Sequence, residues 1–168
     1  MNSAFRINQG ATLDLAGYSN SVGSIAGAGL VTNSGVTAAL LTTGNYTQEA
    51  TGTLAIQILS DTNFDQLEVK DKASLNGALT VALPAGFVPR PGQQFVFLTA
   101  HGGVTGHFGS LKGPAGVSLK VRYTQDAVSL TFNTFDPVKG LAGNLNGVYR
   151  GNGTDRSAAG TPGARSRQ

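Results

Sequence analysis

Apolar and polar residues alternate one by one along several short segments of the chain, and this alternation limits its fold most strongly. Successive side chains of a β-strand point to opposite faces of the sheet, so a period of two predicts a strand with one buried face. The segments with this pattern are residues 13–15, 54–58, 66–70, 79–83, 119–123 and 128–132. They predict an all-β chain whose branched aliphatic side chains point inward.

Clusters of Gly, Asn, Asp and Pro separate these segments. Gly, Asn and Asp tolerate a positive φ and Pro fixes φ at a negative value suited to turns, so these clusters predict turns between strands. Glycine supplies 24 of the 168 residues and charged side chains only 12%, against about a quarter in an average soluble domain. This composition is typical of turn-dense β-structure with a neutral polar surface. The predicted turns are residues 17–20, 33–35, 44–45, 60–63, 84–92 and 113–116.

A short pattern recurs along the chain: Ser or Thr, then Leu, one further residue and an apolar residue. It occurs at residues 12–15, 53–56, 118–121 and 129–132, with a degenerate copy at 74–77. The intervals between leucines are 41 from Leu13 to Leu54, 21 from Leu54 to Leu75 and 44 from Leu75 to Leu119. These intervals are close to multiples of about 21, which is typical of the coils of a β-helix. A sandwich of two antiparallel sheets remains the alternative.

The last interval, 11 residues from Leu119 to Leu130, is too short for a coil. It predicts a hairpin that turns at residues 124–126. The last coil of a solenoid exposes unpaired backbone groups and apolar side chains, so a hairpin in this position would cap the stack.

The chain is expected to divide into a folded segment, residues 1–135, and a linker with a flexible tail, residues 136–168. Leu141, Leu145 and Val148 would line one face of a short helix, although glycines weaken it. Residues 151–168 contain no large apolar side chain and are predicted to be disordered. Residues 1–8 lack the regions of a secretory signal, so the chain is expected either to stay inside the cell or to be a fragment whose signal lies upstream.

The positive net charge is confined to the end of the chain. Residues 1–140 hold eight basic and eight acidic groups. Residues 141–168 hold one acidic group, Asp155, and four basic groups: Arg150, Arg156, Arg165 and Arg167. A folded segment without net charge does not predict a nucleic-acid partner. No apolar run approaches the roughly 18–20 residues of a membrane-spanning helix, so direct membrane insertion is not predicted either.

Several motifs resemble those of autotransporter passengers built from β-strand repeats. The resemblance covers residues 5–133 and rests on the segments 10–17, 24–29, 44–48, 64–67, 79–81 and 91–99. It implies a right-handed parallel β-helix that is exported to the cell surface, with further coils beside it. In that family a linker helix, which residues 138–150 resemble, and an outer-membrane barrel follow the passenger. No strand segments typical of such a barrel follow residue 150, so truncation or an early end of the reading frame is expected.

The residues that most resemble catalytic groups do not form a known motif. His101 and His107 are six residues apart, which matches neither a helical zinc pair nor a zinc finger, and no acidic residue lies between Asp71 and Asp126 to orient them. Both are predicted to lie on a surface loop. The acidic residues Asp61, Asp65, Glu68 and Asp71 suggest a calcium site or a glycosidase pair, but intervening lysines favour an exposed charge pattern.

Other candidate groups also favour structural roles. Ser24 and Ser110 lack the Gly-x-Ser-x-Gly motif of a nucleophile elbow, and the glycines at 27–29 and 102–103 are assigned to turns. The absence of Cys excludes disulfide bonds and thiolate chemistry. The N-glycosylation motifs at 45–47 and 152–154 matter only in a eukaryotic secretory pathway. The tyrosines, which could stack on sugars but form no local platform, are predicted to pack at coil corners: Tyr18, Tyr46, Tyr123 and Tyr149.

Taken together, these patterns predict a non-catalytic structural or adhesive segment of a secreted or cell-surface protein. No catalytic, cofactor-binding or metal-binding residue is assigned, and no cofactor is expected. The expected partners are host surfaces or glycans, neighbouring coils and, from the resemblance, an outer-membrane barrel. The alternative is a carbohydrate-binding or carbohydrate-active β-helix protein.

Overall fold

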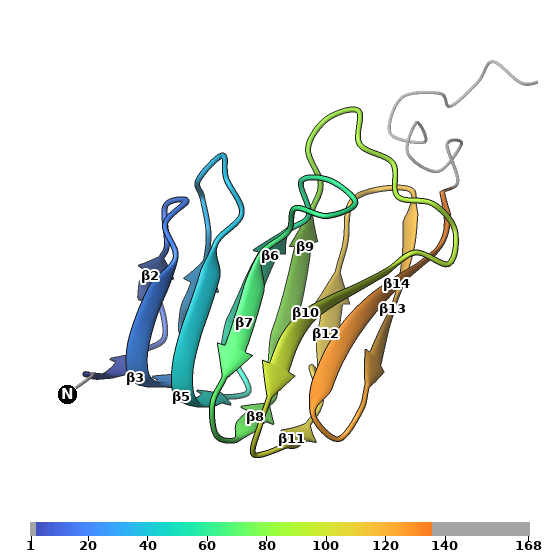
Figure 1. Ribbon diagram of the computed structural model, residues 1–168. Coiled ribbons are helices and arrows are strands. Elements are labelled where there is room, and N and C mark those ends of the chain that lie inside the picture. Colours follow the sequence, from blue (N-terminus) through green and yellow to red (C-terminus); the bar gives the residue numbers. More distant parts are fainter. Residues whose placement is uncertain (1–2, 136–168) are drawn as a thin grey trace, which may run out of the picture.

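The computed structural model describes residues 3–135, and every regular element in this part of the chain is a β-strand (Figure 1). The prediction of an all-β chain is therefore confirmed. Sheet A contains β1 (Ala4–Ile7), β3 (Asn20–Gly27), β5 (Leu40–Gln48), β7 (Gln66–Val69), β8 (Ala73–Leu75), β10 (Gln94–Ala100), β11 (Val104–Gly106), β13 (Val117–Tyr123) and β14 (Ala127–Phe135). Sheet B contains β2 (Thr12–Asp14), β4 (Leu30–Thr32), β6 (Thr53–Gln57), β9 (Ala78–Ala82) and β12 (Ser110–Lys112).

From β1 to β12, each pass of the chain runs from sheet A to sheet B and back, and each new strand pairs in parallel with a strand of the preceding pass. In sheet B one column of side chains shows the register, because partners across the strands face the same side. The column contains Leu13, Val31, Leu54, Leu79 and Leu111. The two sheets stand as two layers in Figure 1.

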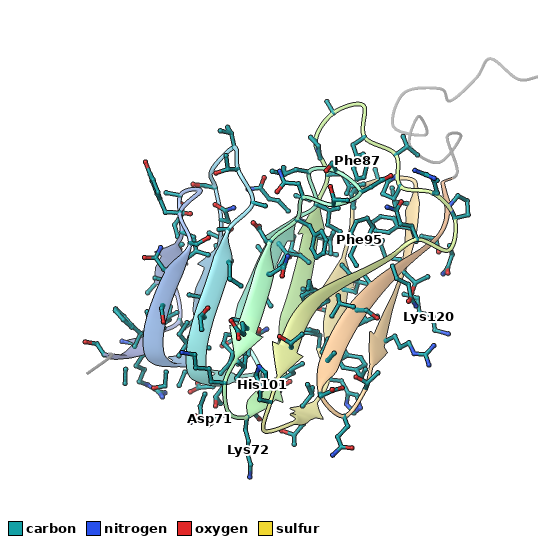
Figure 2. All side chains as sticks on the ribbon, in the orientation of Figure 1. Asp71, Lys72, Phe87, Phe95, His101 and Lys120 are labelled. Carbon is teal, nitrogen blue, oxygen red and sulfur yellow. The ribbon has the colours of Figure 1, made fainter. Side chains whose placement is uncertain are left out.

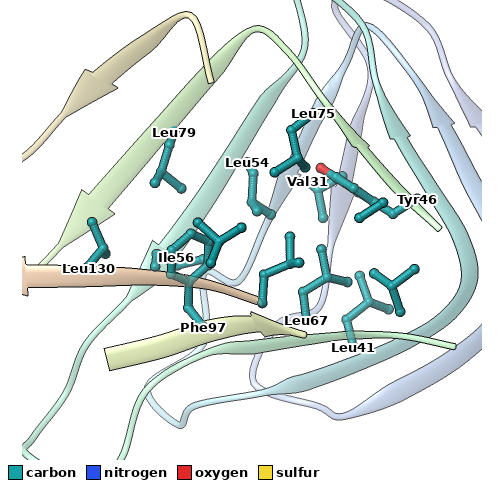
Figure 3. Close-up of a cluster of buried hydrophobic side chains, with 14 of the residues drawn as sticks. Val31, Leu41, Tyr46, Leu54, Ile56, Leu67, Leu75, Leu79, Phe97 and Leu130 are labelled. Atoms are coloured by element: carbon teal, nitrogen blue, oxygen red, sulfur yellow. The ribbon is translucent and has the colours of Figure 1, made fainter. Parts of the chain in front are cut away.

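The side chains that point between the layers form one hydrophobic core (Figure 3). In sheet A, Leu41, Leu67 and Leu98 lie opposite one another on successive strands and are 2%, 3% and 0% exposed. Leu54 and Leu79 face them from sheet B. Burying a leucine fully contributes roughly 1.5–3 kcal/mol to stability. Alternation therefore places the chain's aliphatic side chains in a continuous core.

The predicted hairpin is present and forms the C-terminal edge of sheet A. β13 and β14 are antiparallel, and β14 also pairs antiparallel with β10. The turn is tied to the preceding pass by backbone hydrogen bonds: Ala100 N donates to Asp126 O at 2.7 Å and Val104 N to Gln125 O at 2.8 Å. Phe132 packs edge-on against Phe95 with ring centroids 5.5 Å apart. The hairpin thus extends both the sheet and the core.

The predicted repeat of about 21 residues is only partly correct. Leu13 and Leu54 do lie in one column, two strands apart. Leu54, however, lies opposite Leu79, 25 residues later, and Leu75 belongs to β8 in the other sheet. Leu119 lies in the antiparallel hairpin. Loops of different length connect the strands, so a constant interval does not mark the paired leucines.

Residues 44–45, predicted to form a turn, lie in the middle of β5. Gly44 is paired on both sides, because its O accepts from Asp71 N at 2.9 Å and β3 runs alongside. A Cβ at Gly44 would lie 2.2 Å from the backbone oxygen of Gly23. Glycine is needed here for the close approach of two strands and not for a change of direction.

The predicted division between residues 1–135 and 136–168 falls at the last described residue. The linker helix predicted from Leu141, Leu145 and Val148 lies outside the described residues. The same holds for the predicted disorder of residues 151–168. These three statements stay predictions.

Candidate functional site

The four carboxylates that cluster in the sequence are separated by the fold. Asp61 lies on the loop between β6 and β7, where its Oδ2 accepts from Arg90 Nη2 at 2.8 Å. A hydrogen bond from the Gln93 side chain is the largest cause that lowers the pKa of Asp61 below 3.8. Glu68 and Asp71 lie on and just after β7, and Asp71 is exposed. Among residues 3–135, no three of these carboxylates come together as a calcium site would require.

Asp65, in contrast, is buried at the corner where the chain enters sheet A, with 4% of its surface exposed. Its Oδ1 accepts from Asn33 Nδ2 at 2.7 Å and from Ala39 N at 2.8 Å, and its Oδ2 accepts from Gln57 N at 2.8 Å. Asn33 also accepts from Gly17 N at 2.6 Å. The prediction of an exposed charge is wrong for Asp65, whose carboxylate joins its own loop to the loop between β4 and β5 and to the end of β6.

His101 lies in the turn after β10, with 66% of its side chain exposed, so the prediction of a surface loop is confirmed for it. The sequence next to it supplies no carboxylate, but the neighbouring strand does. Glu68 Oε1 lies 3.7 Å from His101 Nε2, and Thr42 Oγ1 donates to Glu68 Oε2 at 3.3 Å. Parallel pairing of β7 with β10 creates this pair, which residue spacing could not indicate.

His107 is also exposed and lies in the loop that begins directly after β11. Its ring packs edge-on against Tyr123, with centroids 5.3 Å apart. The Tyr123 hydroxyl accepts from Phe108 N at 3.0 Å, and burial raises the pKa of this hydroxyl. His107 therefore contributes to the contact between the loop and the hairpin, and it does not join His101 in one site.

The tyrosines have different environments. Tyr46 is 1% exposed, its hydroxyl donates to Gln48 Oε1 at 2.8 Å, and burial raises its pKa far above the ordinary value. The prediction of packing is thus confirmed for Tyr46 and for the half-buried Tyr123. It is wrong for Tyr18, which is 74% exposed on the loop before β3. Tyr149 lies outside the described residues.

The serines and the glycosylation motif lie on strands. Ser24 lies in β3 and is half-buried, whereas Ser110 lies in β12 in the other sheet. Asn45 lies in β5, and its Oδ1 accepts from Lys72 N at 3.2 Å. The second motif, residues 152–154, lies outside the described residues.

The outer face of sheet A offers a broad surface of mostly uncharged side chains. One row across the strands contains Thr42, Glu68, Thr99 and Ala127 in register. Such a face, which is flat and has polar groups of short reach, is suited to contact with another surface and not to the enclosure of a small substrate.

At the hairpin the character of this outer face changes. Lys120 lies opposite Thr131, and Thr131 lies opposite Gln94 on β10. Arg122 lies opposite Ser129 in the next row. We call this region the hairpin face and define it by five residues that line a shallow concavity: Gln94, Lys120, Arg122, Thr131 and Asn133. Sequence alternation places Lys120 and Arg122 on one side of a strand but does not show that β10 and β14 complete the surface.

The chain matches no protein-family model and no curated protein. Within residues 3–135, no three His, Asp or Glu side chains come together as metal ligands. No helix among these residues is long and apolar enough to cross a membrane.

Proposed function

We propose that this chain is a non-catalytic structural and contact segment of a bacterial cell-surface protein of the autotransporter passenger type. Residues 1–135 would form the C-terminal part of a right-handed parallel β-solenoid associated with the outer membrane. Further coils and a membrane barrel would be its neighbours in the full-length protein. The surface of the solenoid would contact host surfaces or glycans.

Parallel pairing between successive passes supports the solenoid. In β5, Thr42 and Thr43 lie opposite Glu68 and Val69 of β7 without a shift of register. The alternative sandwich consists of antiparallel sheets, whereas antiparallel pairing of named strands here involves β10, β13 and β14. Parallel strand connections are right-handed in about 98% of known cases, and this preference supports the proposed hand.

The observation that carries the proposed function is the combination of one continuous core with a mostly uncharged outer face. Backbone pairing and the column from Leu13 to Leu111 stabilise the stack, so the outward side chains are not needed for the core. Along sheet A these outward side chains include Thr42, Thr99 and Thr131, which suit contact with water and glycans. Inner side chains thus stabilise the fold while outer side chains remain available for contact, and this arrangement supports a structural and display role.

The location is tested in the organism that carries the gene. Antibodies raised against residues 3–135 should label intact cells, and proteinase added outside should remove the label while a periplasmic marker survives. Labelling that requires permeabilised cells would contradict the proposal. The same experiment on cells that lack the gene provides the background signal.

The carbohydrate-binding alternative is favoured by one specific observation. The hairpin face gathers two cationic side chains with amides and hydroxyls in one concavity. This concavity lies on the proposed contact surface and offers polar groups that a glycan would bind.

A further inference from the structure

Two cationic side chains of β13 lie on the same side of the strand. Lys120 and Arg122 are two residues apart and exposed, while the half-buried Val121 between them faces the other way. A strand rises about 3.3 Å per residue, so their Cα atoms are roughly 6–7 Å apart. Figure 2 shows Lys120 extending from the hairpin into solvent. The two positive charges therefore occupy neighbouring rows of one surface.

Neither cation is neutralised by the part of the chain that the structure describes. Arg6 pairs with Glu49 and Arg90 pairs with Asp61, at 2.9 Å and 2.8 Å. Among the described residues, no ion pair involves Lys120 or Arg122. An anionic partner from outside would complement them.

The surroundings of the two cations offer hydrogen bonds of the kind that sugars use. Gln94 Nε2 donates to Thr131 Oγ1 at 3.4 Å, and Asn133 lines the same concavity. Val96 on β10 is 46% exposed and lies opposite Ser129, one row away. Amides and hydroxyls can bind the hydroxyl groups of a sugar ring, and an exposed aliphatic side chain can contact its C–H face.

We propose that the hairpin face binds an acidic polysaccharide, with Lys120 and Arg122 holding carboxylate or sulfate groups on neighbouring sugars. This inference rests on the proposed contact function and names its ligand class. Two cations are fewer than the four to eight of a lipid-binding cluster. Single-stranded nucleic acid would need aromatic stacking, but Tyr123, which borders this face, packs its ring against His107.

The experiment uses the full 168-residue chain and three fluorescent oligosaccharides: oligogalacturonate, a heparin fragment and neutral dextran. Binding is measured by anisotropy over a range of salt concentrations. We expect one or both acidic probes to bind and dextran to bind at least tenfold more weakly. The double variant K120Q/R122Q should weaken binding about tenfold, as two exposed ion pairs contribute. It should also reduce the dependence of binding on salt.

Two control variants separate this site from other positive charges. K70Q/K72Q removes the same charge from the segment after β7 and should change binding less than twofold. The variant in which Arg150, Arg156, Arg165 and Arg167 are replaced by Gln removes the basic end of the chain and should also leave the preference for acidic probes. Circular dichroism of each variant checks that the fold is retained.

Four outcomes would overturn the inference: no binding of either acidic probe, equal loss in K70Q/K72Q, loss only in the tail variant, or self-association of K120Q/R122Q with unchanged binding. In the last case the cations would serve to keep the edge strand β13, which has one sheet neighbour, from pairing with other chains. If the chain is displayed on cells but binds no acidic probe, the proposed function stands and this inference fails.

Discussion

Replacing Asp65 with Ala should destabilise the fold more than any other removal of a carboxylate in the described part of the chain. The buried carboxylate accepts hydrogen bonds from Asn33 Nδ2, Ala39 N and Gln57 N, all between 2.7 and 2.8 Å. Asp65→Ala leaves these three donors without their acceptor, in a corner where the backbone leaves little room for rearrangement.

The magnitude follows from the number of donors. A hydrogen bond to a charged group contributes about 1.5–3 kcal/mol, and a buried donor without a partner costs a similar amount. Allowing for water that enters beside the exposed loops, we expect Asp65→Ala to lower the free energy of unfolding by about 3–5 kcal/mol. Asp65→Asn keeps the volume but turns an NH2 group toward one of the donors, so it should cost about 1–3 kcal/mol.

The measurement is urea unfolding followed by far-UV circular dichroism, because the chain has no Trp to report by fluorescence. Asp61→Ala is the matched control, because the side chains of Asp61 and Arg90 are 41% and 81% exposed and an ion pair in water contributes little to stability. If Asp65→Ala and Asp61→Ala lower the stability by equal amounts, the buried corner does not hold the fold as argued.

Three further predictions concern stability, and the first two use urea unfolding while the third uses thermal unfolding at several pH values. Leu79→Ala, at a fully buried position, should lower the free energy of unfolding by about 2–5 kcal/mol. Leu111→Ala, at the 37% exposed residue opposite Leu79, should lower it by about 1 kcal/mol or less. Equal losses would contradict the burial of the column in sheet B. Gly10→Ala meets nothing within 4 Å and should lower the free energy of unfolding by only the strain of φ 83°, about 1–2 kcal/mol. Gly44→Ala should lower it more, because its Cβ would lie 2.2 Å from a backbone oxygen. A hydrogen bond from the Ser34 hydroxyl is the largest cause that lowers the pKa of Asp14 below 3.8. The stability that the ionised Asp14 contributes is therefore present above pH 3.8 and is lost as the pH falls below that value. Asp14→Asn should make Tm depend less on pH in the acid range, and an unchanged dependence would contradict this.

Elements with strong local signals were predictable from the sequence. Alternation located β9, β13 and β14, and the turn at residues 124–126 joins the last two as expected. In a strand with one exposed face, the pattern of a single segment carries the whole signal. These elements could therefore be recognised without knowledge of their neighbours.

The long strands of sheet A were harder to predict. β3 contains Gly23 and β5 contains Gly44, and both residues suggest turns when read locally. Their role depends on how closely the neighbouring strand approaches, because a Cβ at Gly44 would meet the backbone of Gly23. A contact between residues in different passes leaves no trace in either segment alone.

The contacts on the outer face of sheet A could not be predicted from single segments either. Spacing in the sequence separates His101 from Glu68 and Lys120 from Gln94, yet parallel and antiparallel pairing brings the members of each set together. The charged residues that follow Asp65 along the chain suggest an exposed carboxylate. Its burial depends on Asn33 and Ala39, which belong to the loop of the preceding pass.

Side-chain alternation and turn chemistry are local properties of the backbone, so the sequence alone predicts an all-β chain, the apolar faces of its clearest strands and the hairpin after residue 117. The identity of the partner strands, the number of residues between them and the contacts between polar groups depend on the tertiary fold. Register depends on loop length and on the packing of one pass against the next, and the alternation within a single strand reports neither.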